Sequence, residues 1–179
     1  MKSVLISIKP KWCELIASGK KTIELRKTRP KLETPFKCYI YQTRKPVSFY
    51  YNERSGKVIG EFVCDRIVEF SPTERGVQFN KFYALYETCL HLSEIRKYLS
   101  GKVGYGWHIS DLVIYDKPRE LSEFRNVCKY LNNDGSCRYK EVDCDCVKFD
   151  FNPDWSINFA ECLDYMSKPP QSWCYVEEL

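Results

Sequence analysis

The pattern of hydrophobic and polar positions changes period within the first part of the chain, and each change marks a predicted element. Residues 3–8 read as a strand. Residues 10–18 read as a short helix that begins at a proline, where the missing amide donor is not needed. Trp12, Leu15 and Ile16 share one face of this helix. A glycine then fits the left-handed position that ends such helices, so the chain is predicted to turn into a second strand.

The second predicted strand, residues 22–27, has one apolar face and one polar face. Alternation points Ile23 and Leu25 in the same direction, as expected for a strand that covers a core on one side. The polar side chains of the opposite face, together with two lysines at its lip, are Thr22, Glu24, Arg26, Lys20 and Lys21. This polar face is the predicted working surface.

The rest of the chain reads mostly as strands with a few short helices. Further strands are expected at residues 36–42, 57–69, 107–115 and 172–177, with a helix near 92–100 and a helical turn near 118–124. The long apolar run in 57–69 fits a strand that is buried on both sides or curved around a barrel. The sequence therefore predicts one α+β domain over residues 1–179, built as a small mixed β-barrel with short helices over its openings.

Residues 19–26, Gly-Lys-Lys-Thr-Ile-Glu-Leu-Arg, resemble the opening motif of the ASCH domain family, whose members have a PUA-like β-barrel fold. Residues 107–124 and 168–178 are similar to the late strands of phage and bacterial members. The resemblance implies a groove, lined by this motif, that holds RNA or a nucleotide. It also implies an alternative function, an amidohydrolase that acts on an acylated, N4-acetylcytidine-like nucleoside.

The residues available for catalysis decide between these two functions. In the hydrolytic members that the chain resembles, a lysine that matches Lys21 works with a threonine at the position of Glu24, and with a later glutamate that the sequence does not place. An enzyme would therefore use Lys21 as base, Thr22 as hydroxyl and Glu24 as orienting group. Glu24 is better suited to an ion pair with Arg26 or Lys20 that shapes the groove, so efficient amidohydrolase activity is not expected.

Charge is distributed unevenly along the chain. The net charge of +4 combines +10 over residues 1–60 with −6 over residues 61–179, as expected when one face meets phosphate. The loop at residues 43–56 mixes cations with aromatic rings that can stack on bases, although such rings often fold back onto the barrel. The candidate residues for binding single-stranded RNA or a nucleotide are Lys20, Lys21, Thr22, Glu24, Arg26, Arg44, Lys45, Tyr50, Tyr51, Arg54 and His108.

Ten cysteines without an export signal indicate reduced thiols or metal ligands in a cytoplasmic protein, and no apolar run is long enough to cross a membrane. Residues 126–166 read as an acidic, cysteine-rich insertion. Its clustered thiols can form a tetrahedral, structural zinc site, with Cys162 as a possible substitute, or they can be unrelated. The candidate zinc ligands are Cys128, Cys137, Cys144 and Cys146. Other cysteines, in apolar contexts, are expected in the core.

Overall fold

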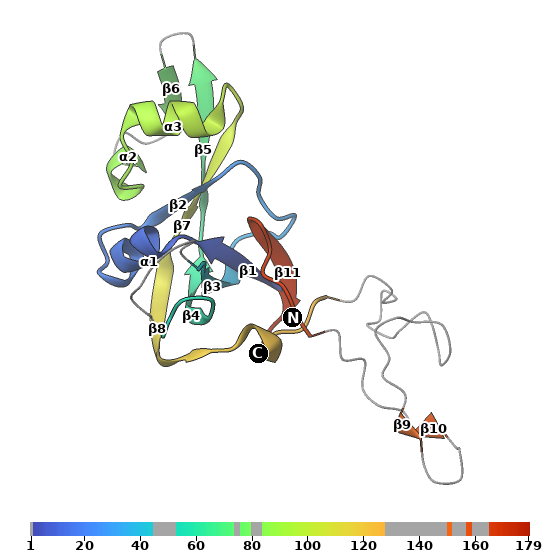
Figure 1. Cartoon of the computed structure of the whole chain (residues 1–179). Coiled ribbons are helices and arrows are strands. Elements are labelled where there is room, and N and C mark those ends of the chain that lie inside the picture. Colours follow the sequence, from blue (N-terminus) through green and yellow to red (C-terminus); the bar gives the residue numbers. More distant parts are fainter. Residues whose placement is uncertain are drawn as a thin grey trace.

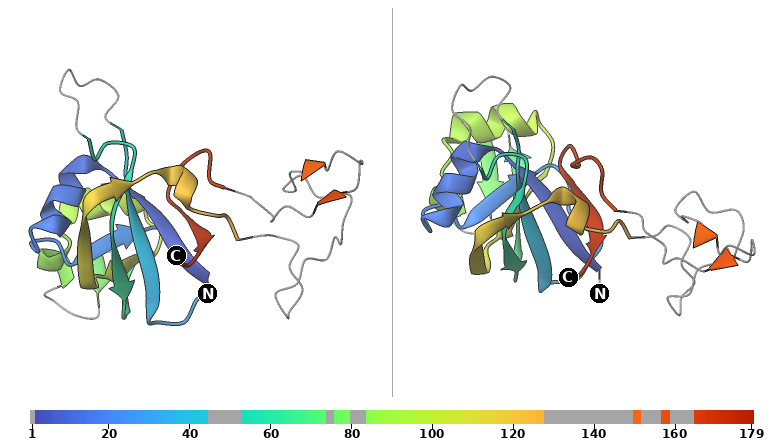
Figure 2. Two further views of the ribbon diagram at one scale, coloured as in Figure 1. Left: turned by 90° about the horizontal axis from the view of Figure 1, so that it is seen from below. Right: turned by 60° about the horizontal axis from the view of Figure 1, so that its bottom comes forward.

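The computed structural model describes residues 2–44, 53–73, 76–79, 84–127, 150–151, 157–158 and 165–179, most of which form two sheets (Figure 1). The five-stranded sheet, ordered β11-β1-β3-β4-β8, contains β1 (Lys2–Ile8), β3 (Phe36–Gln42), β4 (Val58–Cys64), β8 (Ser110–Arg119) and β11 (Trp173–Glu177). These strands follow one another side by side in Figure 2. The four-stranded sheet, ordered β2-β7-β5-β6, contains β2 (Ile23–Arg26), β5 (Ile67–Thr73), β6 (Gly76–Phe79) and β7 (Gly104–His108). Two short strands, β9 (Asp150–Phe151) and β10 (Ile157–Asn158), pair separately.

The helices are short. They are α1 (Pro10–Ala17), α2 (Ala84–Glu87), α3 (Leu92–Leu99) and the 3-10 helix η1 (Leu121–Glu123). Helix α3 lies across the four-stranded sheet and buries Ile95 and Leu99 against Ile23 and Leu25 of β2 (Figure 1). Strands outnumber helices, which confirms the predicted α+β class. Among the described residues, no helix is both long and apolar enough to span a membrane.

The strands do not close into the predicted barrel. Among the described residues, the strand ladders end at β11 and β8 in one sheet and at β2 and β6 in the other, and beyond β11 there is only an isolated bridge from Val176 to Asn126. The predicted single strand over 57–69 is also wrong, because the chain is interrupted at Asp65 and Arg66. Before the interruption β4 pairs with β3 and β8, and after it β5 pairs with β6 and β7. The apolar run over residues 57–69 therefore passes from the five-stranded sheet to the four-stranded sheet.

One hydrophobic cluster joins the two sheets. Trp107 of β7 is fully buried in a cluster with Ile8 of β1 and Phe62 of β4. Its ring meets Phe36 of β3 edge to face, with the ring centroids 5.7 Å apart. Helix α1 contributes Ile16 to the same cluster. This packing fixes α1, and with it the start of β2, against the five-stranded sheet.

The two ends of the predicted insertion, residues 126–166, lie next to each other. Arg125 and Tyr165 form an antiparallel bridge, and the amide of Met166 donates to the carbonyl of Phe124 at 2.8 Å. The amide of Glu177 in β11 donates to the carbonyl of Arg125 at 3.0 Å. The chain therefore leaves and re-enters the described core at one place beside β11 (Figure 1).

Candidate functional site

A cavity of about 440 Å³ lies where α1, β2 and α3 meet the residues just before β11. We call it the motif cavity, because Lys21, Glu24 and Arg26 of the 19–26 motif line it. The other residues that line this cavity are Ser7, Lys9, Trp12, Leu25, Thr43, Leu90, Glu94, Tyr98, Gln171 and Ser172. The sequence motif therefore forms a wall of a concave site, as expected for a ligand pocket of this size.

Strand pairing explains why the polar side chains of β2 reach this cavity. Ile23 and Leu25 pack into the hydrophobic cluster under α3, so the alternate side chains Glu24 and Arg26 point the other way. In the antiparallel pairing with β7, Glu24 lies opposite Trp107 of the core. The predicted division of this strand into an apolar and a polar face is confirmed.

The three charged residues of the motif form one buried ion-pair network. Glu24 lies between the two cations, with Oε1 at 3.1 Å from Nη2 of Arg26 and Oε2 at 3.3 Å from Nζ of Lys21. Arg26 Nη2 also donates to the carbonyl of Ser7 at 2.6 Å. Lys21, Glu24 and Arg26 are only 2%, 6% and 8% exposed. Buried charges persist only when they are paired and hydrogen-bonded, and here both conditions are met.

Lys21 lies at the floor of the cavity instead of at its lip. The amides of Lys20 and Lys21 both donate to the carbonyl of Leu15 at 3.0 Å, so the chain folds tightly over the end of α1 and Lys21 turns inward. Its Nζ donates to the carbonyls of Ile23 at 2.8 Å and Thr88 at 2.7 Å, in addition to its contact with Glu24. Lys20 remains exposed and does not line the cavity.

Two other candidates lie outside the cavity. Thr22 is half-buried, and its backbone bridges Glu87 and Ile109. His108 pairs with Ile23, so its side chain is on the opposite face of the sheet from Glu24. Its Nδ1 is 2.5 Å from Oδ1 of Asp65. Burial acts to raise the pKa of Asp65, but the hydrogen bond and electrostatic attraction of His108, together with the charge of Arg66, outweigh it and leave that pKa lowered.

The described loop candidates, Arg44 and Arg54, do not line the motif cavity. Arg44 is exposed and lines a second cavity, and Arg54 is exposed near the end of the same loop. Several predicted site residues lie outside the described part of the chain; they are Lys45, Tyr50, Tyr51, Cys128, Cys137, Cys144 and Cys146. Within the described ranges, no group of three or more His, Cys, Asp or Glu side chains is arranged to hold a metal ion.

The sequence reasoning missed the walls of the cavity. Trp12 was placed on the apolar face of its helix, and here its ring lies over Nζ of Lys21 at 5.2 Å from the ring centroid. Tyr98, on α3, is 39% exposed and also lines the cavity. Burial raises the pKa of its hydroxyl, although the nearby charge of Arg26 opposes this effect. The sequence did contain a signal for these walls: Trp12 on α1 and Tyr98 on α3 are aromatic residues where the apolar face of each helix meets its polar face.

Comparisons with known proteins agree with the motif. The chain is similar to crystal structures of two point mutants of an ASCH protein from Zymomonas mobilis. The first is 27% identical with a TM-score of 0.50, over 68% of this chain and 77% of that one. The second is 27% identical with a TM-score of 0.49, over 66% and 74%. No curated protein matches the chain. The family model of the ASCH domain matches residues 6–103, more than half of the chain and all of the motif, so the protein belongs to the ASCH domain family.

Proposed function

We propose that this protein binds single-stranded RNA or a nucleotide, with one base in the motif cavity. The observation that carries the proposal is the combination of a buried, charged floor with aromatic walls. Bases are recognised by hydrogen bonds to their edges and by stacking on their faces, and this cavity offers groups for both. The floor is Lys21, Glu24 and Arg26, and the aromatic walls are Trp12 and Tyr98.

The floor is rigid before any ligand arrives. Lys21 and Arg26 are held by backbone carbonyls as well as by Glu24, so their positions do not depend on the ligand. Such preorganisation lowers the entropy lost on binding. Nε of Arg26 is buried and has no hydrogen-bond partner within the described residues, so its N–H is an unused donor.

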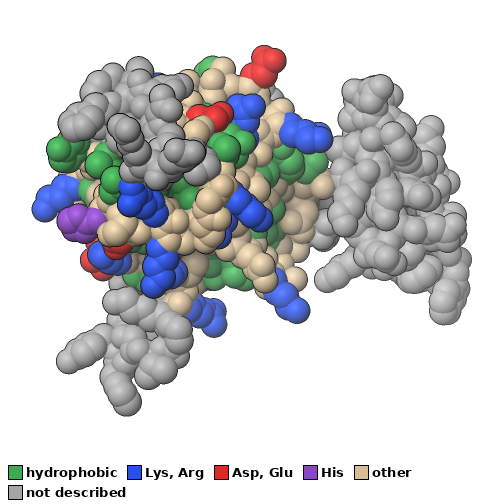
Figure 3. All heavy atoms as spheres, turned by 90° about the horizontal axis from the view of Figure 1, so that it is seen from above, with side chains coloured by type: hydrophobic (Ala, Val, Ile, Leu, Met, Phe, Trp, Pro, Cys, Tyr) green, Lys and Arg blue, Asp and Glu red, His purple; other side chains and the backbone are tan. Residues whose placement is uncertain are grey.

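The charge around the cavity favours an anionic ligand. Its lining contains three cations, Lys9, Lys21 and Arg26, against two carboxylates, Glu24 and Glu94. Lys9 is exposed and is therefore free to approach a phosphate. Lys and Arg side chains are also spread over the face of the molecule in Figure 3, with few acidic side chains between them. These features agree with the excess of positive charge in residues 1–60.

The environment of Lys21 favours binding over hydrolysis. An ammonium group has three hydrogens, and Nζ has three oxygen neighbours, on Ile23, Thr88 and Glu24. A general base must instead present a free lone pair toward the substrate. The described partners therefore occupy all three hydrogens of Lys21, which makes it a structural group that holds Glu24 in place. Rapid turnover of N4-acetylcytidine by the wild-type protein would contradict this assignment and favour the amidohydrolase.

Removal of one aromatic wall tests the proposal. Tyr98→Ala is expected to weaken binding of a fluorescein-labelled hexaribonucleotide about tenfold, because stacking of a base on an aromatic ring contributes about 1–3 kcal/mol. Fluorescence anisotropy measures the affinity. Tyr86→Ala is the matched control, since Tyr86 is 69% exposed and does not line the cavity. Equal affinities of the Tyr98 and Tyr86 variants, both folded by circular dichroism, would refute a base in this cavity.

A further inference from the structure

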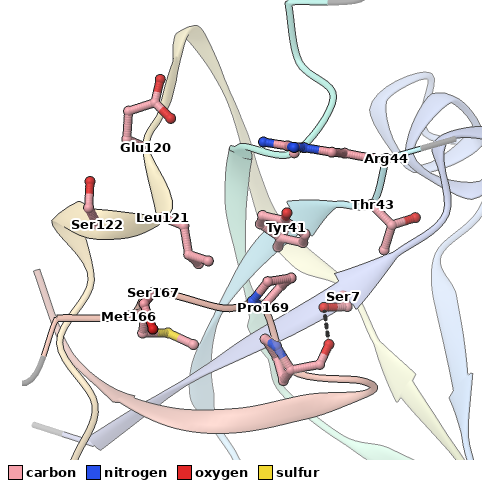
Figure 4. Close-up of a pocket in the computed structure, with 12 residues that line it drawn as sticks. Ser7, Tyr41, Thr43, Arg44, Glu120, Leu121, Ser122, Met166, Ser167 and Pro169 are labelled. Atoms are coloured by element: carbon pink, nitrogen blue, oxygen red, sulfur yellow. Dashed lines mark hydrogen bonds between the residues drawn. The ribbon is translucent and has the colours of Figure 1, made fainter. Parts of the chain in front are cut away.

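A second cavity of about 510 Å³ adjoins the motif cavity (Figure 4). It lies between the end of β3, the 3-10 helix η1 and residues 166–170, and we call it the η1 cavity. Ser7 and Thr43 line both cavities. The two spaces are therefore neighbours that share one wall, and each has the volume of a small-molecule site.

The shared wall is part of the sheet. Ser7 belongs to β1 and pairs with Tyr41 of β3, and the amide of Thr43 donates to the carbonyl of Ile8 at 2.9 Å. The Oγ of Ser7 donates to the carbonyl of Pro170 at 2.6 Å, as drawn in Figure 4. Hydrogen bonds on both sides of this wall hold it in place, so the relative position of the two cavities is fixed.

The η1 cavity combines an apolar interior with the cation of Arg44 and one carboxylate, Glu120, which is paired with Lys57 at 2.8 Å. Tyr41, Leu121, Met166 and Pro169 supply ring and aliphatic surface, and Figure 4 shows Leu121 pointing into the space. The Arg44 side chain extends over the cavity from the strand end that carries Tyr41. Apolar walls can cover the face of a base, and an exposed guanidinium can bind a phosphate.

Gly56 keeps the path of the Arg44 side chain open. A Cβ atom on Gly56 would lie 2.5 Å from Nε of Arg44, which is closer than real contacts allow. Gly56 also has φ of +81°, a conformation that glycine adopts without strain. The absence of a side chain on Gly56 therefore allows the Arg44 side chain to lie across the loop.

We propose that the η1 cavity holds the second nucleotide of a single-stranded RNA whose first base occupies the motif cavity, with Arg44 on its phosphate. This inference rests on the proposed function and makes it more specific, because it assigns an oligonucleotide instead of a free nucleotide. Adjacent cavities with a common wall suit adjacent nucleotides of one strand. Among the described residues that line the η1 cavity, Arg44 is the only arginine, and its position suits the phosphate of the second nucleotide.

Ligand length provides the test. Affinities are measured by calorimetry for a ribonucleoside monophosphate, a 5′-phosphorylated diribonucleotide and a hexaribonucleotide of mixed sequence. Arg44→Gln is expected to weaken the two longer ligands about fivefold and to lower the salt slope of the hexamer by about 1, with no change for the monophosphate. Leu121→Trp places an indole in the η1 cavity. It is also expected to weaken the two longer ligands and to leave the affinity for the monophosphate unchanged. Arg66→Gln is the control, because Arg66 lines neither cavity.

The outcomes separate this inference from the function on which it rests. If Tyr98→Ala weakens all three ligands while Arg44→Gln and Leu121→Trp leave the longer ligands unaffected, the second subsite is refuted and the motif cavity stands. If Arg44→Gln weakens the monophosphate as much as the hexamer, the two cavities do not hold successive nucleotides. If the wild-type protein binds none of the three ligands, both proposals are overturned.

Discussion

At the scale of single residues, Lys21 shows how a charged side chain becomes part of a core. It is 2% exposed, yet its ammonium group has three oxygen neighbours, one of them the carboxylate of Glu24. Because Glu24 also contacts Arg26, removing any one member leaves the others buried with fewer partners. The proposed binding surface and the stability of this part of the fold therefore involve the same three side chains.

Lys21→Met is expected to lower the free energy of unfolding by about 3 kcal/mol, because it leaves two buried carbonyls and part of the Glu24 carboxylate without a partner. Urea denaturation followed by tryptophan fluorescence measures the change. Lys20→Met is the matched control, since Lys20 is adjacent but exposed, and its effect should stay within about 0.5 kcal/mol. Similar losses in the two variants would show that the network around Lys21 contributes nothing specific.

Sequence reasoning predicted the polar face of β2 and the ion pair of Glu24, because both depend on residues that are close in the sequence. It did not predict the burial of Lys21, since one of its acceptors, the carbonyl of Thr88, comes from the turn after α2. It also grouped His108 with the site, whereas the register of β7 points that side chain to the other face. Contacts across the sheet were not available from the local pattern.

At the scale of elements, three neighbouring strands of the five-stranded sheet are connected by a polar cluster on one face. Glu61 of β4 has Oε1 at 3.2 Å from Nζ of Lys37 on β3, and its Oε2 accepts a hydrogen bond of 2.5 Å from the hydroxyl of Tyr115 on β8. Burial acts to raise the pKa of Glu61, but the hydrogen bonds with Tyr115 and Lys37 outweigh it, so the pKa is lowered.

This cluster predicts a pH-dependent contribution to stability. A carboxylate with a lowered pKa in the folded state stabilises that state above its ordinary pKa of 4.5, and the contribution is lost as the pH falls through the lowered value. The difference in unfolding free energy between the wild type and Glu61→Gln should therefore be largest near neutral pH and shrink below pH 4.5. Urea titrations across this range measure it. A difference that is independent of pH would contradict the role of the charge.

The same scale explains why the strand boundaries were only partly predictable. The ends of β1, β3 and β11 agree with the hydrophobic pattern to within one or two residues, because a polar residue or a proline marks each end. The pattern did not show the division between β4 and β5, since apolar residues lie on both sides of Asp65 and Arg66. Strand pairing joins residues that are far apart in the sequence, so the local pattern did not show that the described strands form two sheets instead of the predicted barrel.

At the scale of the whole molecule, the zinc site expected within residues 126–166 stays a prediction. The four clustered cysteines lie outside the described residues, so the proposal of a structural zinc ion rests on their number and proximity in the sequence. Protein purified without chelators should contain about one zinc ion per chain by plasma mass spectrometry. Replacing Cys144 and Cys146 with serine should abolish it, whereas replacing the buried Cys38 should not. A wild-type protein without zinc would disprove the metal site.

The adjacent ends of this segment have a consequence for how the family can vary. Because the bridge between Arg125 and Tyr165 closes the core, the gap that the segment must span is the same for a short loop as for a long one. The entropy of closing a loop grows only with the logarithm of its length. Evolution can therefore lengthen, shorten or exchange these residues in related proteins while β11 and both cavities keep their places.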